Sequence, residues 1–262
     1  MMRPTFVLVA GSWHTAACFD PLIKTLDDAG YASVAVKPRC LNSSPPATSF
    51  QPDADALKEV LVELRDKDVI LVMHSYGGLV GTDVVGDLVL NKPEVAARIK
   101  RLVYLAAFVP LKGQNLVEAF LSVPGPRPEP YFDYDDGYLV LRDIAEELFY
   151  HDVPEPERSR YVAMLGKHPA GANTDPISHA GYEHVPSTYI FTTMDRAVLP
   201  GHQRLAVERV RSHIRERVAA GEALEKPFSG ALGEFSIATG HSAMIVRPEE
   251  LAGILGRIAE AI

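Results

Sequence analysis

The stretch from Val69 to Gly81 reads VILVMHSYGGLVG, an apolar run that ends in a serine and continues into small residues. The apolar part predicts a strand buried on both faces, and the residues after Ser75 predict a helix. A sharp turn between a strand and a helix holds a serine at its tip, where the next backbone N–H and the helix N-terminus can stabilise an oxyanion. Ser75 is therefore the candidate nucleophile.

One residue departs from the G-x-S-x-G pattern that usually marks such a turn. Met73 stands where the first glycine is expected, while Gly77 and Gly78 follow the serine and allow the helix to approach the strand. Short motifs also occur by chance, so a serine in a glycine-rich turn without a catalytic role stays open at this point.

Further apolar runs bounded by turn residues predict the rest of a parallel sheet. Helical patterns alternate with the early runs, at 19–29 and 52–64, and a last helix begins at Pro248 with Leu251, Ile254, Leu255 and Ile258 as its buried stripe. The predicted strands cover residues 5–10, 33–37, 69–73, 102–107, 188–193 and 235–239. This alternation predicts a doubly wound, mostly parallel six-stranded α/β sheet.

The region 111–185 breaks this alternation. It begins with closely spaced prolines, continues through an acidic and aromatic stretch at 131–137 that predicts a loop, and then shows short helical patterns at 143–150 and 155–165. An insertion after the carboxyl end of a strand lies over the ligand-binding edge of the sheet. We therefore expect a helical lid at 111–185 and a core formed by 1–110 and 186–262.

Two later strands are followed by residues that can activate Ser75. Asp195 comes shortly after the strand at 188–193, and His241 comes shortly after the strand at 235–239. Their chain order, serine then aspartate then histidine, suits a triad in which His241 takes the proton of Ser75 and Asp195 orients the imidazole. A turn aspartate paired with Arg196, and a histidine that only packs in its loop, are the alternatives.

The first predicted strand runs into Gly11-Ser12-Trp13-His14. The backbone N–H groups of Ser12 and Tyr76 are the candidates for an oxyanion hole. The side chains of Trp13 and His14 either line the substrate pocket or only pack beneath this loop, and aromatic residues of the lid divide in the same way between pocket and lid core. The candidate substrate-binding residues are Gly11, Trp13, His14, Phe108, Phe120, Tyr138 and Phe149.

Composition narrows the function classes. The chain has 262 residues, enough for one α/β domain, and a net charge of −8 without basic runs, which disfavours nucleic acid as a partner. Its two cysteines, Cys18 and Cys40, suit a reducing compartment, and no apolar segment has the length of a signal peptide core or a membrane span. We expect a cytoplasmic protein that acts on a small molecule, without membrane contact; a homodimer is left open.

Metal and cofactor chemistry are disfavoured. Asp175, His179 and His184 form the one sequence cluster of metal-ligating types, and their spacing fits no usual zinc set. Gly11 does not open a dinucleotide-binding G-x-G-x-x-G motif, because Ser12-Trp13-His14 follows it. We expect no metal and no cofactor.

Together these motifs resemble the lid-bearing α/β-hydrolases that include plant methylesterases, hydroxynitrile lyases and microbial esterases. The resemblance runs nearly end to end and rests on residues 6–19, 74–78, 102–110, 186–190, Asp195, Gln203 and 240–242. It implies a Ser75–His241–Asp195 triad, an oxyanion hole from the first loop and the serine turn, and no cofactor. It also implies that the chain starts at the first parallel strand of that fold.

Departures from the family bear on the reaction. The cyanogenic lyases have a lysine after the catalytic histidine and a threonine in the first loop, where this chain has Ser242 and Gly11. The resemblance therefore favours hydrolysis of an ester, lactone or thioester of an apolar small molecule through an acyl-enzyme. A cofactor-free lyase, cyclase or condensation catalyst that uses His241 as base is the first alternative, and a ligand receptor on the same scaffold is the second.

Overall fold

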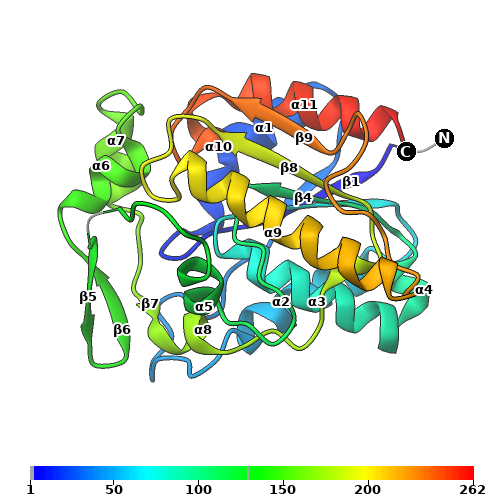
Figure 1. Cartoon of the computed structure of the whole chain (residues 1–262). Coiled ribbons are helices and arrows are strands. Elements are labelled where there is room, and N and C mark those ends of the chain that lie inside the picture. The colour runs from blue at the N-terminus through cyan, green and yellow to red at the C-terminus, as the bar shows by residue number, and fades with distance from the viewer. Residues whose placement is uncertain (1–2, 129) are drawn as a thin grey trace.

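Six strands form one parallel sheet in the computed structural model, which describes residues 3–128 and 130–262. Neighbouring strands follow the order β2-β1-β3-β4-β8-β9, and every pair is parallel (Figure 1). The strands are β1 (Thr5–Val9), β2 (Ser33–Ala35), β3 (Val69–His74), β4 (Ile99–Leu105), β8 (Ser187–Thr192) and β9 (Glu234–Ile237). The predicted doubly wound, six-stranded sheet is confirmed, with small differences at the strand ends.

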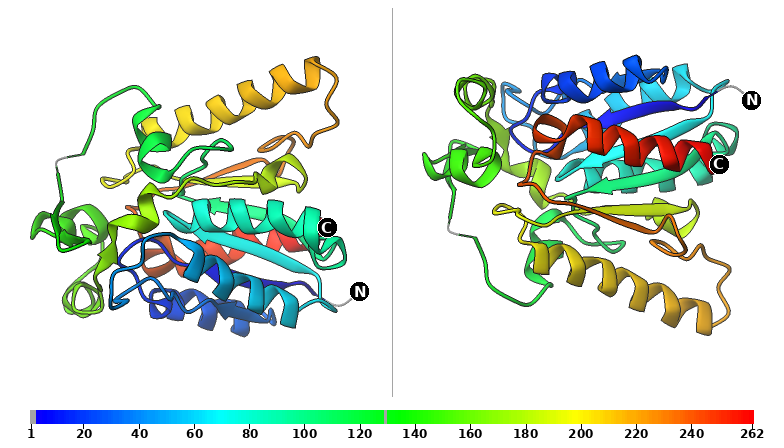
Figure 2. Two further views of the ribbon diagram at one scale, coloured as in Figure 1. Left: turned by 90° about the horizontal axis from the view of Figure 1, so that it is seen from below. Right: turned by 90° about the horizontal axis from the view of Figure 1, so that it is seen from above.

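Helices cover both faces of this sheet (Figure 2). The longer helices are α1 (Asp20–Asp28), α2 (Gln51–Glu63), α3 (Gly77–Asn91), α9 (Pro200–Ala219) and α11 (Pro248–Glu260). Successive residues of a strand point to opposite faces, so Phe6 and Leu8 of β1 pack with α1 and α11, whereas Val7 and Val9 pack with α2, α3 and α9. Short helices are η1 (Ala16–Phe19), α4 (Pro93–Ala96) and α10 (Ala243–Val246).

Several helices begin at or next to a proline residue. Helices α1, α2, α9 and α11 each have a proline at the first or second position. Proline is tolerated there because the missing N–H has no partner within the helix and the fixed φ suits the first turn. The helices predicted at 19–29 and 52–64 and after Pro248 are present, and α9 is an additional helix.

The strand order changes direction between β1 and β3, which are neighbours in the sheet. In open α/β sheets, ligands bind beyond the carboxyl ends of the strands at such a point. The loop after β1 contains Ser12, and the turn after β3 contains Ser75. The topology alone therefore brings both segments to one edge.

From residue 116 to residue 174, the chain between β4 and β8 folds at one end of the sheet (Figure 1), and its last part runs back along α3 to the start of β8. It contains α5 (Leu116–Leu121), β5 (Phe132–Asp135), β6 (Tyr138–Leu141), α6 (Ile144–Tyr150), α7 (Glu157–Val162), β7 (His168–Pro169), α8 (Ala170–Thr174) and η2 (Gly181–Glu183). We refer to residues 111–185 as the 111–185 segment. Two of its helices, α6 and α7, correspond to the helical patterns predicted at 143–150 and 155–165.

The loop prediction at 131–137 is wrong. Strands β5 and β6 form an antiparallel hairpin, and β7 pairs with β6 on its other side. The hairpin turns at Asp136 and Gly137, which both have positive φ, 44° and 84°. An Asp-Gly pair readily adopts this conformation in a two-residue hairpin turn, so the sequence did contain a hairpin signal.

No helix within the described ranges is both long enough and apolar enough to cross a membrane.

Candidate active site

Ser75 lies in the turn between β3 and α3 with a positive φ of 54°, a conformation that residues other than glycine rarely adopt. Its N–H donates to the carbonyl of Leu105 at 3.2 Å, and its carbonyl accepts from the N–H groups of Gly78 and Phe108 at 3.0 and 3.1 Å. These bonds attach the turn to β4 and to the chain that follows β4. The strained backbone is therefore held from several sides.

Glycines allow α3 to start close to the sheet. A Cβ atom at Gly77 would lie 2.7 Å from the carbonyl oxygen of Val9, and one at Gly78 would lie 2.2 Å from that of Phe108. Both distances are too short for any side chain. The two glycines after the serine are thus sterically required.

Met73 is accommodated by a third glycine, one that lies in the helix instead of the strand. A Cβ atom at Gly81 would lie 2.2 Å from the Met73 sulfur. The thioether therefore fills the space that Gly81 leaves open on α3. This contact explains how the turn forms without a glycine at position 73.

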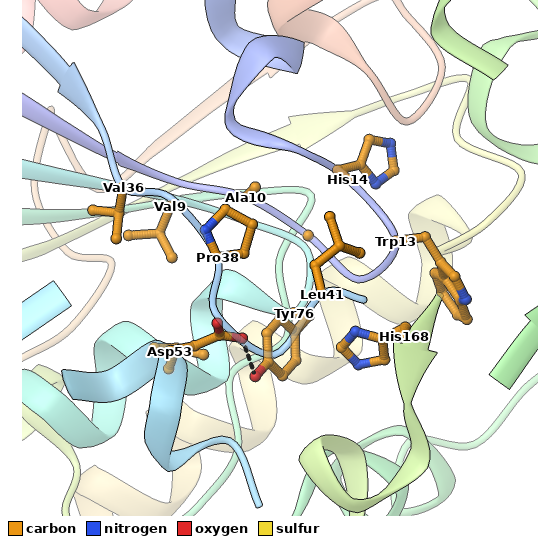
Figure 3. A pocket seen from close by; sticks show the side chains of 12 residues that line it. Val9, Ala10, Trp13, His14, Val36, Pro38, Leu41, Asp53, Tyr76 and His168 are labelled. Atoms are coloured by element: carbon orange, nitrogen blue, oxygen red, sulfur yellow. Dashed lines mark hydrogen bonds between the residues drawn. The ribbon is translucent and has the colours of Figure 1, made fainter. Parts of the chain in front are cut away.

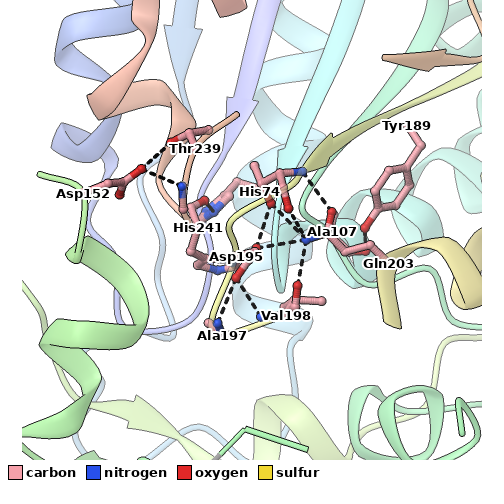
Figure 4. A network of polar contacts seen from close by, with 12 residues as sticks. His74, Ala107, Asp152, Tyr189, Asp195, Ala197, Val198, Gln203, Thr239 and His241 are labelled. Carbon is pink, nitrogen blue, oxygen red and sulfur yellow. Dashed lines mark hydrogen bonds and ion pairs between the residues drawn. The ribbon is translucent and has the colours of Figure 1, made fainter. Parts of the chain in front are cut away.

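The loops after β8 and β9 bring Asp195 and His241 together (Figure 4). His241 Nδ1 lies 2.8 Å from Asp195 Oδ2, and both side chains are almost fully buried, with exposed fractions of 2% and 0%. The alternative partner of Asp195 is excluded, because Arg196 pairs with Glu147 at 2.7 Å.

Asp195 accepts hydrogen bonds on both oxygens. Oδ1 accepts from the N–H groups of Ala197 and Val198 at 2.8 and 2.9 Å. Oδ2 accepts from the Thr192 hydroxyl at 2.8 Å and the Gln203 amide at 3.0 Å, besides its contact with His241. These donors compensate the burial of the carboxylate and fix its orientation toward the imidazole.

Two further groups hold the loop that contains His241 (Figure 4). His74 Nε2 lies 3.0 Å from the His241 carbonyl oxygen and donates to it. Burial lowers the pKa of His74 well below its ordinary value, so this imidazole is neutral. From the 111–185 segment, Asp152 Oδ2 accepts from the Thr239 hydroxyl at 2.8 Å and the Gly240 N–H at 2.6 Å.

A cavity of about 270 Å³ contains both Ser75 and His241 in its wall. No hydrogen bond joins these two side chains in the described structure, and catalytic hydrogen bonds of this type often tighten only when substrate binds. The wall is mainly apolar. Of the predicted substrate-binding residues, Trp13, His14, Phe108, Phe120 and Phe149 line the cavity.

Gly11 and Tyr138 do not line this cavity, contrary to prediction. Gly11 packs directly against Ser75, because a Cβ atom at Gly11 would lie 2.9 Å from the Cβ atom of Ser75. The Tyr138 hydroxyl donates to the carbonyl of Ser43, outside the cavity. Because side chains alternate along a strand, its neighbour Leu139 faces the cavity instead.

The loop after β1 is held by its own side chains. His14 Nδ1 donates to the Ser12 carbonyl at 2.7 Å, and Trp13 Nε1 donates to the Leu139 carbonyl at 2.7 Å. Burial lowers the pKa of His14 to about 4. The sequence left open whether Trp13 and His14 line the pocket or only pack beneath the loop. Their side chains do both, since they support the loop and also line the cavity.

The two candidate oxyanion donors come from neighbouring strands, Ser12 from the loop after β1 and Tyr76 from the turn after β3. The backbone N–H groups of Ser12 and Tyr76 have no acceptor among the described residues. The Tyr76 hydroxyl donates to Asp53 Oδ2 at 2.9 Å (Figure 3), and Asp53 Oδ1 accepts from the Cys40 N–H at 2.8 Å. This carboxylate anchors the residue that follows the serine.

Asp53 and Asp152 were not identified from the sequence. Each acts on a segment far away in the chain: 23 residues separate Asp53 from Tyr76, and 88 separate Asp152 from Gly240. A local pattern contains no signal for such contacts. Asp53 lies in the first turn of α2, where acidic residues are common, so its position gave no sign of the contact with Tyr76.

Within the part of the chain that the structure describes, no group of three or more His, Cys, Asp or Glu side chains is arranged to hold a metal ion. His179, from the sequence cluster with Asp175 and His184, has its Nδ1 atom 3.5 Å from an Asp83 carboxylate oxygen.

The chain is similar to known hydrolases in sequence and in structure. It is 25% identical to an alpha/beta hydrolase, nvfD, of Aspergillus novofumigatus (strain IBT 16806), over 76% of this chain and 80% of the relative. It is 38% identical to a carbendazim hydrolyzing esterase of Nocardioides sp. (strain SG-4G), over 55% and 61%. The crystal structure of polyneuridine aldehyde esterase superposes with a TM-score of 0.75 at 20% identity, covering 98% of this chain and 100% of that one.

A family match extends over nearly the whole chain. The model of the alpha/beta hydrolase family matches residues 6–254, which include the strand-to-helix turn and both later loops of the site. This chain is a member of the alpha/beta hydrolase family, and its relatives include esterases.

Proposed function

We propose that the protein is a serine hydrolase that cleaves an ester of an apolar small molecule through an acyl-enzyme. One observation carries the proposal: Ser75 and His241 line the same cavity, while His241 Nδ1 lies 2.8 Å from Oδ2 of the buried Asp195. This arrangement supports Ser75 as the nucleophile, His241 as the base and Asp195 as the group that orients the base. The esterase among the relatives supports the same reaction class.

The acylation step follows from these positions. Ser75 Oγ attacks the ester carbonyl carbon while His241 Nε2 takes the hydroxyl proton. The N–H groups of Ser12 and Tyr76 bind the oxyanion, and such a donor contributes about 100- to 1000-fold in rate. The bond to the leaving alcohol then breaks, and the alcohol takes the proton from His241.

Deacylation uses the same groups in reverse. Water attacks the acyl carbon and loses a proton to His241, which returns a proton to Ser75 as the acid leaves. Throughout, Asp195 stabilises the imidazolium and holds the tautomer with its proton on Nδ1. The donors around Asp195 keep it from turning toward any other partner.

The cavity supports an apolar substrate, and we infer that the 111–185 segment acts as a lid over it. Phe120, Phe132 and Phe149 of this segment line the cavity together with Trp13 and Phe108 of the core, and their rings are in contact where the segment meets the core. Closing such a wall excludes water and strengthens the electrostatic interactions in the site. The segment would therefore determine which substrates fit, while the core 1–110 and 186–262 runs the reaction.

Replacing Ser75 by alanine tests the proposal. With para-nitrophenyl butyrate as substrate, Ser75→Ala should lower kcat by about 10⁴-fold or more, because the acyl-enzyme cannot form. A fluorophosphonate probe should label the wild-type protein and not Ser75→Ala. The matched control is Ser12→Ala, which removes the other serine of the cavity wall and should still be labelled.

Ester hydrolysis and probe labelling, measured on wild type and Ser75→Ala, also separate a serine hydrolase from the alternative functions. A folded wild-type protein that neither reacts with the probe nor hydrolyses esters would contradict the proposal. Activity that survives in Ser75→Ala would favour a reaction that needs only His241 as a base, as in the lyase or cyclase alternative.

A further inference from the structure

One part of the cavity wall is polar. Ser12, from the loop after β1, and Asn173, from α8, both line the cavity, and His168 of β7 lies behind them. His168 Nε2 is 2.9 Å from Asn173 Oδ1 and 3.3 Å from Ser12 Oγ. The three residues are 95% buried or close to it, with exposed fractions of 5% for Ser12, 6% for Asn173 and 2% for His168.

The positions of the protons follow from these contacts. Burial lowers the pKa of His168 to about 4, so the ring is neutral at pH 7. Its Nε2 faces two oxygens, which places the single ring proton on this atom as a donor to both. The hydroxyl proton of Ser12 and the NH₂ group of Asn173 are then free to donate elsewhere.

Neither donor has a second partner among the described residues. Asn173 makes one side-chain hydrogen bond, through its oxygen, and the Ser12 hydroxyl contacts only His168. Because both residues line the cavity, the Asn173 NH₂ group and the Ser12 hydroxyl proton are open to a ligand or water there. His168 lies beneath Trp13 and beside Tyr76 (Figure 3), which fixes it in place.

We propose that Asn173 and Ser12 form a subsite for a hydrogen-bond acceptor oxygen on the substrate, separate from the reacting carbonyl. This inference rests on the proposed function and narrows the substrate class to apolar esters with a second carbonyl or an ether oxygen. Ser12 also supplies a candidate oxyanion N–H from its own backbone. The acceptor therefore lies only a few bonds from the ester carbonyl.

A neighbouring residue shows what a satisfied hydroxyl in the same wall looks like. Thr174 follows Asn173 in α8 and also lines the cavity. Its hydroxyl donates back to the carbonyls of Ala170 and Gly171, at 3.4 and 3.3 Å. Thr174 thus has no free donor and provides a matched control.

The test compares two esters that differ in one carbonyl, para-nitrophenyl levulinate and para-nitrophenyl pentanoate. The quantity measured is the ratio of their kcat/KM values, levulinate over pentanoate. Asn173→Leu should lower this ratio about tenfold relative to wild type, and Ser12→Ala about threefold, since each removes a donor to the keto oxygen. Thr174→Val should keep the wild-type ratio.

Comparing ratios between variants cancels the different intrinsic reactivity of the two esters. An unchanged ratio in both Asn173→Leu and Ser12→Ala would overturn the subsite. Should Asn173→Leu not fold by circular dichroism, Ser12→Ala decides alone. Failure of wild type to hydrolyse either ester would contradict the proposed function instead, so the two failures are distinguishable.

Discussion

The two halves of the cavity wall are built very differently. On the core side, every residue of β3 and β8 is buried, and Ser75 and Asp195 are each held by several hydrogen bonds. On the other side, all four residues of β5 are exposed, and β5 pairs only with β6, through a turn at Asp136 and Gly137. The proposed nucleophile and orienting acid thus lie on the side that is fixed by burial and hydrogen bonds, while the hairpin that contributes Phe132 to the wall lies on the side that tolerates change.

The largest effect should come from changing the orienting acid on the core side. In Asp195→Asn, the amide can donate to His241 Nδ1 and so favour the wrong tautomer, a change that costs about 10⁴-fold in kcat in serine proteases. We expect a loss of this size with para-nitrophenyl butyrate. Arg196→Gln, which removes only the exposed pair with Glu147, should keep kcat within about twofold. More than about a tenth of wild-type activity in Asp195→Asn would show that another group orients His241.

The boundary between the two halves should be sensitive to acid. His14 on the core side and His168 on the other have pKa values lowered from 6.5 to about 4, mainly by burial. Between these values the unfolded chain binds protons that the folded chain does not, so the free energy of unfolding falls as the pH decreases from 6.5 to 4. The loss is on the order of 3 kcal/mol per histidine.

Urea unfolding at pH 7 and pH 4.5 measures this loss. His168→Gln, which removes one of the two groups, should lose clearly less stability on acidification than wild type. The exposed His184 provides the control, because His184→Gln should lose as much as wild type. Equal losses in all three proteins would mean that the boundary histidines do not determine acid stability.

The smallest effect should come from the hairpin. Phe132 lines the cavity and its ring centroid is 5.7 Å from that of Trp13, yet it is 36% exposed. Phe132→Ala should therefore lower the free energy of unfolding by less than about 1 kcal/mol, while it raises KM for para-nitrophenyl butyrate about threefold. Tyr134, two residues further along β5 and 71% exposed, does not line the cavity, so Tyr134→Ala should leave KM unchanged. Equal effects of Phe132→Ala and Tyr134→Ala on KM would show that Phe132 does not contact the substrate.

The same contrast explains which features the sequence predicts. Strands β1, β3 and β8, which are buried along their whole length, appear as continuous apolar runs, and the partly exposed β2 and β9 still show short runs bounded by turn residues. Ser75, Asp195 and His241 were selected because each follows such a run, and their catalytic roles stay a prediction. The exposed β5 has no such run, and α9 buries few apolar residues, among them Val207, Val210 and Ile214. These elements depend on turn chemistry and tertiary packing more than on periodicity.

The sequence also did not predict which side chains of β6 point into the cavity. Tyr138 was predicted in the pocket, whereas Leu139 lies there, because a shift of one residue along a strand moves a side chain to the opposite face. The pairing of β6 with β7 determines that face, and β7 lies about 30 residues away in the chain. Long-range pairing of this kind cannot be deduced from the residues around Tyr138.

The contact between Met73 and Gly81 has a consequence for recognising other members of this group. The space between strand and helix at the serine turn can be provided by a glycine on either element, so positions 73 and 81 share one volume constraint. A search that demands glycine two residues before the serine would pass over this chain. A rule that accepts a bulky residue there, together with glycine six residues after the serine, would retain it, and the two positions should then vary as a pair.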